Sequence, residues 1–164
     1  MTKFGGGYKF PDKTESRLNI GDIVDEIVDD KYYKLSDIVH QKVEQCEGFI
    51  KVPQATKKGY IECPFGGVFD MSFPNSKNRR GRVQDNGSVC PTILTGNASQ
   101  LIYVEETGRM RNFSDTEIFR LMGVHDYYID KIKRIGLSTN QQYFLAGNSI
   151  VVPVIARVLR NAFC

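Results

Sequence analysis

Apolar residues recur at helical spacing in the first part of the chain. The first set follows Asn19, a residue type that often caps helices, and comprises Ile20, Ile23, Val24, Ile27 and Val28. A second, shorter set follows Ser36 and comprises Ile38, Val39 and Val43. This spacing predicts two short helices within a linker that spans residues 1–48.

Between Phe49 and Val104 the pattern changes to short β-branched and aromatic runs, which Gly, Pro and Asn separate. Such runs are typical of strands, and the pair at residues 86–87, Asn-Gly, is a strong signal for a hairpin turn. We therefore expect a mostly antiparallel β unit over residues 49–108. Pairing across the turn is expected to hold residues 82–83 near residues 89–92.

The last third of the chain, residues 109–164, has helical patterning. Ser114 and Glu117 form a capping-box signature, which predicts a helix that ends at Gly123. A second box at residues 138–141 predicts a helix that stops at residues 147–148, and Pro153 suits the first turn of a final helix. The whole pattern predicts an α+β fold.

Composition adds little to this picture except at one place. The chain has 164 residues, is 41% hydrophobic and carries a net charge of +3, which suits a folded core and only slightly favours polyanionic partners. The initial residues lack a signal-peptide core, and no apolar run approaches the roughly 18 residues needed to span a bilayer, so we expect a cytoplasmic protein without a membrane partner. Four basic residues gather within six positions: Lys77, Arg79, Arg80 and Arg82.

The cysteines and histidines do not suggest a metal site. Cys46, Cys63, Cys90 and Cys164 show no CxxC spacing, and the two histidines, residues 40 and 125, lie far apart in sequence. We therefore expect four reduced thiols and no bound metal.

Three ordered segments resemble motifs of DNA cytosine-5 methyltransferases. Residues 111–123 are similar to the ninth motif of this family, and residues 138–153, with a Gly-Asn pair before Val-Pro, are similar to the tenth. Arg82-Val83 and the Pro-Thr pair of residues 90–93 resemble the two recognition loops of the family's target recognition domain. His125 departs from the pattern, because the family usually has proline there.

The resemblance implies a fold and a DNA-binding surface. The fold would be a small antiparallel target recognition domain, flanked by helices that pack on a Rossmann-like catalytic domain absent from these residues. The N-terminal and C-terminal helices are expected to meet beside that junction. The residues expected to contact double-stranded DNA are Arg79, Arg80, Arg82, Gln84, Thr92, Thr95 and Asn97. Arginine pairs with guanine and glutamine with adenine in the major groove. Without the resemblance, the same arginines would be interpreted as a solvated basic loop.

The resemblance also implies where S-adenosyl-L-methionine would bind. Asn148 and Ser149 of the tenth motif are expected to contact its methionine part, although a Gly-Asn pair is also an ordinary helix C-cap that tolerates positive φ. In contrast, residues of the family similar to Arg111, Glu117 and Arg120 mostly brace the recognition domain against the catalytic domain, so these three are expected to be structural and not catalytic.

The chemistry of the family is not represented in this sequence. The family's nucleophile follows a proline, whereas Cys63 and Cys90 each precede one, and there is neither a Glu-Asn-Val tripeptide nor a Gly-rich cofactor loop. Motifs one to eight are absent from these residues, so we expect no catalytic residue here.

The sequence therefore favours the DNA-recognition part, or a small subunit, of a restriction-modification methyltransferase of bacterial or phage origin. Such an enzyme transfers a methyl group to C5 of a flipped cytosine, and the catalytic portion would be the partner of this chain. Two alternatives remain at this point: a stand-alone or relic DNA-binding module without activity, and a structural protein whose motif matches are accidental.

Overall fold

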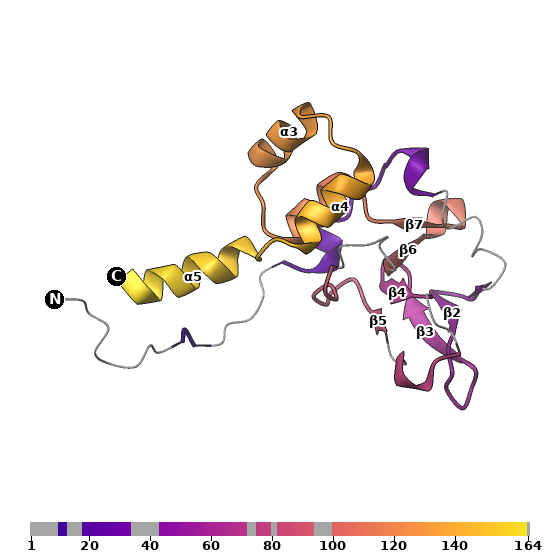
Figure 1. The fold of residues 1–164 in the computed structure, drawn as a ribbon. Coiled ribbons are helices and arrows are strands. Elements are labelled where there is room, and N and C mark those ends of the chain that lie inside the picture. The colour runs from indigo at the N-terminus through magenta and orange to yellow at the C-terminus, as the bar shows by residue number, and fades with distance from the viewer. Residues whose placement is uncertain are drawn as a thin grey trace.

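The structure is a computed structural model of the chain, and it describes residues 10–12, 18–33, 43–71, 75–79, 82–93 and 100–163. The strands gather at one end of the molecule, three helices occupy its middle, and the last helix projects at the opposite end (Figure 1). The helix-rich and strand-rich parts are joined through a shared core.

All strand pairs are antiparallel, as predicted. The first sheet has the order β1-β2-β3, and its strands are β1 (Glu44–Gln45), β2 (Phe49–Pro53) and β3 (Tyr60–Pro64). The second sheet has the order β5-β4-β6-β7, and its strands are β4 (Val68–Asp70), β5 (Val83–Gln84), β6 (Gln100–Val104) and β7 (Arg109–Asn112). The β6–β7 pairing crosses residue 108, so this sheet continues past the predicted end of the β unit; the division at residues 48 and 108 stays a prediction.

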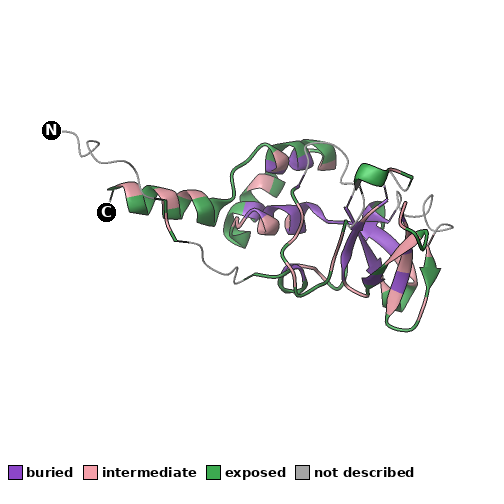
Figure 2. Cartoon of the chain, turned by 90° about the horizontal axis from the view of Figure 1, so that it is seen from below, coloured by how far each residue is buried: buried purple, intermediate pink, exposed green. Residues whose placement is uncertain are grey.

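The second sheet lies between two hydrophobic cores. Successive residues of a strand point to opposite faces, so Leu101 and Tyr103 of β6 pack with Ile50 and Val52 of the first sheet. Ile102, between them in sequence, packs in the other core with the helices. Because both faces of β6 are covered, four of its five residues are buried (Figure 2).

The helices are α2 (Asp115–Leu121), α3 (Asp126–Arg134), α4 (Thr139–Gly147) and α5 (Val152–Phe163). Both predicted capping boxes are confirmed: Ser114 and Glu117 bond each other reciprocally at the start of α2, and Ser138 and Gln141 do so at the start of α4. Helix α3 was not predicted. It begins after His125, an uncommon cap residue, whose Nδ1 accepts a hydrogen bond from the Tyr127 backbone at 3.2 Å.

The predicted helix after Asn19 is wrong. The structure has only two short 3-10 helices there, η1 (Ile20–Asp22) and η2 (Asp30–Tyr32). Remote partners occupy backbone groups that a helix would use, because the Asp25 amide donates to Glu117 at 2.7 Å and the Asp25 carbonyl accepts from Arg111 at 3.0 Å. The helix predicted after Ser36 falls mainly outside the described residues.

The predicted hairpin at residues 86–87 is also wrong in part. The turn forms, because the Ser88 amide donates to the Asp85 carbonyl at 3.1 Å. However, β5 before the turn pairs with β4, and residues 89–93 after it form no strand. The turn carbonyls of Asn86 and Ser88 instead accept hydrogen bonds from η1. Tertiary contacts of the N-terminal segment therefore replace cross-turn pairing.

The N-terminal segment meets the C-terminal helices, as expected, although η1 stands where an α-helix was predicted. Ile20 is completely buried in one core with Ile118 and Phe119 of α2 and with Ala146 of α4. This contact places Ile20 in the same core as the C-terminal helices.

Residues Thr139–Phe163 are together long and apolar enough to cross a membrane, by length and composition alone, which the sequence pattern did not predict. They form two helices, because α4 ends at Gly147 and α5 begins at Val152. Tyr143 and Ala146 anchor α4 in the core, whereas no residue of α5 is buried.

Candidate functional site

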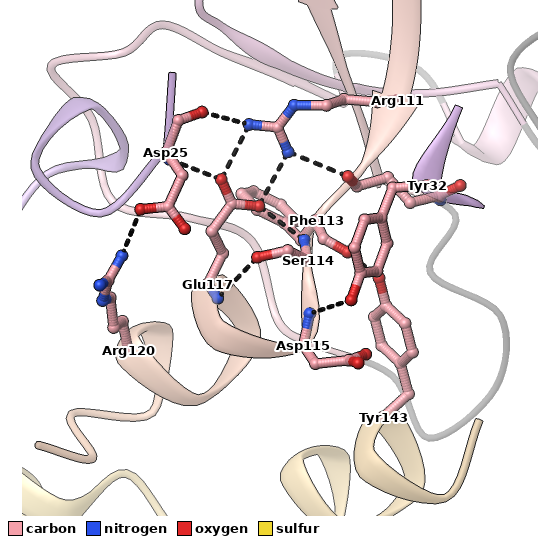
Figure 3. Close-up of polar contacts among 10 residues, drawn as sticks. Asp25, Tyr32, Arg111, Phe113, Ser114, Asp115, Glu117, Arg120 and Tyr143 are labelled. Atoms are coloured by element: carbon pink, nitrogen blue, oxygen red, sulfur yellow. Dashed lines mark hydrogen bonds and ion pairs between the residues drawn. The ribbon is translucent and has the colours of Figure 1, made fainter. Parts of the chain in front are cut away.

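A buried ion pair joins three segments of the chain (Figure 3). Arg111 of β7 and Glu117 of α2 are 1% and 0% exposed, and two parallel hydrogen bonds of 2.8 Å connect them. Arg111 also donates to the Asp25 carbonyl at 3.0 Å, while Glu117 accepts from the Asp25 amide at 2.7 Å. A buried ion pair is tolerated when its remaining polar atoms are satisfied in this way.

A second set of contacts continues from this ion pair to α4. The Tyr32 hydroxyl accepts a hydrogen bond from the Asp115 amide at 3.2 Å, and the Tyr143 hydroxyl donates to the Phe113 carbonyl. Burial raises the pKa of Tyr143, which keeps its hydroxyl protonated and able to donate. Tyr32 and Tyr143 thus hold η2 and α4 against the loop that begins α2.

Arg120 forms the outer edge of the same cluster. It donates to Asp25 at 2.7 Å and to Asp126 at 2.8 Å, so it links the N-terminal segment to the start of α3. The hydrogen bond and charge of Arg120 lower the pKa of the Asp126 carboxyl. The structure therefore gives Arg111, Glu117 and Arg120 structural contacts within this chain, and bracing against a catalytic domain stays a prediction.

The brace supports a groove of about 1150 Å³. Its walls come from four places: residues 10–12, 18, 19 and 23 of the N-terminal part, residues 89–93, residues 120–123 at the end of α2, and residues between 147 and 158 that lead into and along α5. Most of the lining side chains are apolar, including Ile23, Met122 and Val154. The groove thus combines segments that are distant in sequence at one hollow surface.

Two of the predicted site residues share this groove. Thr92, expected to contact DNA, and Ser149, expected to contact the cofactor, both line it. Asn148 is exposed, and its Nδ2 donates to the Phe144 carbonyl at 3.0 Å. Positive φ is not used at this helix end, because Asn148 has φ −88°; the side chain of Asn148 caps the helix instead.

The segments that resemble the ninth and tenth motifs meet directly beside the groove. Gly123 adopts φ +73°, and a Cβ atom at this position would collide with the ring of Pro153. The Val152 amide donates to the Met122 carbonyl at 2.9 Å. The glycine of one motif and the proline of the other are therefore in contact.

The other predicted DNA contacts lie apart from the groove. Arg82 is exposed and donates to Asp70 at 3.0 Å, and Gln84 lies half-buried in β5. Arg79 is the last residue of the 3-10 helix η4 (Lys77–Arg79). The remaining predicted contacts, Arg80, Thr95 and Asn97, lie outside the described residues.

The buried thiol of Cys63 and the half-buried thiol of Cys90 are unsuited to nucleophilic attack. Burial raises the pKa of the Cys90 thiol to about 12, and burial together with the charge of Asp85 raises the pKa of Cys63 to about 12. The reactive form of cysteine is the thiolate, so both groups are protonated and inert near neutral pH. Among the residues that the structure describes, no three His, Cys, Asp or Glu side chains are grouped as metal ligands.

Sequence reasoning missed Asp25 and Tyr32, which complete the brace. Their partners lie 83 to 95 residues away, so no local pattern marks them. The Arg111–Glu117 pair, in contrast, spans six residues within one recognised motif.

Comparisons with known proteins agree with the family that the sequence motifs indicated. The family model of the C-5 cytosine-specific DNA methylases matches residues 7–164. The chain is 26% identical over 163 residues to the type II methyltransferase M2.ScrFI of Lactococcus lactis subsp. cremoris, an alignment that covers 95% of this chain and 36% of that protein. It is 30% identical over 153 residues to the type II methyltransferase M.SsoII of Shigella sonnei, with 90% of this chain and 33% of that protein covered. The chain thus spans about a third of the length of these relatives.

Proposed function

Because this chain belongs to the C-5 cytosine-specific DNA methylase family, we propose that it is the DNA-recognition part, or a small subunit, of a DNA (cytosine-5-)-methyltransferase. The observation that carries this proposal is the family match over residues 7–164, in a chain that spans about a third of its relatives. The catalytic nucleophile then belongs to an N-terminal portion or partner subunit, and the assembled enzyme works in the bacterial cytoplasm.

The thiols support this division of labour. The family chemistry needs a thiolate that attacks a flipped cytosine. Cys63 is buried and Cys90 is half-buried, their pKa values are raised to about 12, and each precedes a proline. Neither side chain presents a nucleophile to an extruded base.

The groove and α5 provide a surface for the catalytic portion. Helix α5 has no buried residue, yet Val154, Ile155, Val158 and Leu159 follow helical spacing along it. An apolar face that remains exposed in one chain marks an interaction site. This observation favours a chain that works beside a catalytic portion over a stand-alone DNA-binding module.

Ser149 and Asn148 fit one wall of an S-adenosyl-L-methionine site. The Asn148 amide donates to its own helix through Nδ2, which leaves its carbonyl oxygen exposed and able to accept a hydrogen bond from an amino group. Ser149 adds a hydroxyl at the groove. The cofactor supplies the methyl group, and the residues of this chain orient its methionine part.

Recognition of DNA is assigned to the strand-rich end and the groove rim. The exposed Arg82 is held by Asp70, so its guanidinium is oriented before DNA arrives. Gln84 and Thr92 carry amide and hydroxyl groups of the kind that contact base edges. Arg79, Arg80, Thr95 and Asn97 complete the proposed contact set.

The test is methyl transfer to duplex DNA. The chain alone should incorporate no labelled methyl group from S-adenosyl-L-methionine, and co-expression with the N-terminal two-thirds of the Shigella sonnei relative should give incorporation. A variant of this chain in which all four cysteines are replaced by alanine should complement as well as the original, provided that it folds. Methylation by the chain alone that survives those four replacements would contradict the proposal.

A further inference from the structure

The hairpin between β2 and β3 ends in two adjacent exposed lysines, Lys57 and Lys58. The turn that carries them is well supported. The Gln54 amide donates to the Gly59 carbonyl at 3.0 Å, and the Thr56 hydroxyl donates to the Tyr60 carbonyl at 2.8 Å. Gly59 adopts φ +79°, a conformation that favours glycine. The two lysines therefore extend from a defined turn.

These lysines differ from other cations of the two sheets. Lys51 pairs with Glu44 at 2.7 Å, and Arg82 pairs with Asp70 at 3.0 Å. Lys57 and Lys58 have no carboxylate of any described residue within 4.0 Å, including Glu62, which lines the same small hollow. Two neighbouring positive charges without a counter-charge repel each other and attract an external anion.

The turn lies in the part of the molecule to which DNA contact is assigned. It stands at the end of the molecule opposite α5, and η4 with its basic residues lies toward the same end (Figure 1). The end of β3 away from the lysine turn, at Pro64, lies beside the end of β5, at Gln84. The carbonyl oxygens of both residues lie within 2.8 Å of the position that a Cβ atom on Gly67 would occupy. The lysine turn and the strand after Arg82 thus belong to one packed unit.

We propose that Lys57 and Lys58 bind phosphate groups of the duplex outside the recognised bases. This inference rests on the proposed function and adds to it a backbone contact that positions the protein. Lysine presents a compact point charge on a flexible stem, which suits phosphates and carries no base code. In the free protein the Asp70 carboxylate compensates the positive charge of Arg82. Lys57 and Lys58 therefore attract the DNA phosphates more than Arg82 alone does.

The experiment measures binding of the full chain to two fluorescently labelled duplexes of ~30 base pairs with unrelated sequences, by anisotropy between about 50 and 200 mM KCl. The Lys57→Ala/Lys58→Ala variant is compared with Lys131→Ala/Lys133→Ala, which removes the same charge from exposed positions of α3. The salt slope is the slope of the logarithm of the binding constant against the logarithm of the salt concentration. Each lost phosphate contact reduces the magnitude of this slope by about 0.9, so the hairpin variant should show a reduction of about 1.8 on both duplexes. The α3 variant should keep the original slope, and Lys57→Arg/Lys58→Arg should restore it.

An unchanged slope in the hairpin variant would overturn the inference while leaving the proposed function intact, as would an equal loss in the α3 variant. A loss confined to one duplex would also overturn it, because phosphate contacts are independent of sequence. If the original chain binds neither duplex at any salt concentration, both the inference and DNA recognition by this chain fail. Circular dichroism of each variant confirms that a loss does not come from unfolding.

Discussion

Gly123 illustrates how a single residue links two motifs. Gly123 follows the C-cap of α2 and has φ +73°, a conformation in which an L side chain is strained. The ring of Pro153 also occupies the space that a side chain at this position would need. Gly136, after α3, has a similar φ of +78° but no atom within 4 Å of its Cβ position. A side chain at Gly136 would therefore suffer backbone strain alone, whereas a side chain at Gly123 would suffer both backbone strain and a steric clash.

We expect Gly123→Ala to destabilise the chain more than Gly136→Ala. The Gly136 variant suffers left-handed strain of about 1–2 kcal/mol. The Gly123 variant adds the displacement of a rigid proline ring, by analogy with overpacking about 1–3 kcal/mol more. Urea unfolding followed by circular dichroism measures both values. Equal losses in the two variants would show that the contact with Pro153 contributes nothing.

At the scale of elements, α5 contrasts with the three helices before it. Helices α2, α3 and α4 each bury residues in the common core, with Ile118, Ile129 and Tyr143 as examples. Helix α5 projects from this body and buries none of its residues (Figure 2). Its apolar positions therefore contribute little to the stability of this chain and are available to a partner.

The element-scale prediction concerns a double variant of α5, Val154→Lys/Leu159→Lys. Both side chains are exposed, so we expect the unfolding free energy to change by no more than about 0.5 kcal/mol. Co-purification with the N-terminal portion of the methyltransferase should be lost, because two charges enter the proposed interface. Ile118→Ala is the stability control and should cost about 2–5 kcal/mol. A comparable stability loss in the α5 variant would contradict this description of the helix.

At the scale of the whole molecule, the N-terminal segment closes the structure around its C-terminal part. Asp25 bonds the buried Arg111–Glu117 pair through its backbone and Arg120 through its side chain. Ile20 fills the core between α2 and α4. These contacts span more than 80 residues, so their formation depends on the complete fold.

Two isoleucines of this segment test that arrangement. In a continuous helix, Ile20 and Ile27 would lie on one face and contribute similarly, whereas the structure buries Ile20 completely and leaves Ile27 90% exposed. We expect Ile20→Ala to cost about 2–5 kcal/mol of unfolding free energy and Ile27→Ala to change it by less than about 0.5 kcal/mol. Chemical denaturation of both variants measures this difference, and similar losses would favour the helix instead.

The sequence by itself determined the features that depend on neighbouring residues. The boxes at Ser114 and Ser138 use hydrogen bonds between residues three positions apart, so their helices were predictable. Short β-branched and aromatic runs separated by Gly, Pro and Asn indicated strands for the same local reason, and the ordered motifs indicated the family. The turn at residues 86–87 was predictable too, because a turn needs only four consecutive residues.

Only the tertiary structure decided where remote backbone and side-chain groups find their partners. The segment after Asn19 has helical periodicity, yet the backbone of Asp25 bonds Arg111 and Glu117 where a helix would need its amide and carbonyl. Strand β5 pairs with β4 and not with the residues after the 86–87 turn. It thereby joins the sheet in which Val68 of β4 enters one hydrophobic core and Phe69 enters the other. Thr92 and Ser149 share one groove for the same reason. Buried polar groups must be satisfied and apolar surface must be covered, and residues far apart in sequence supply both.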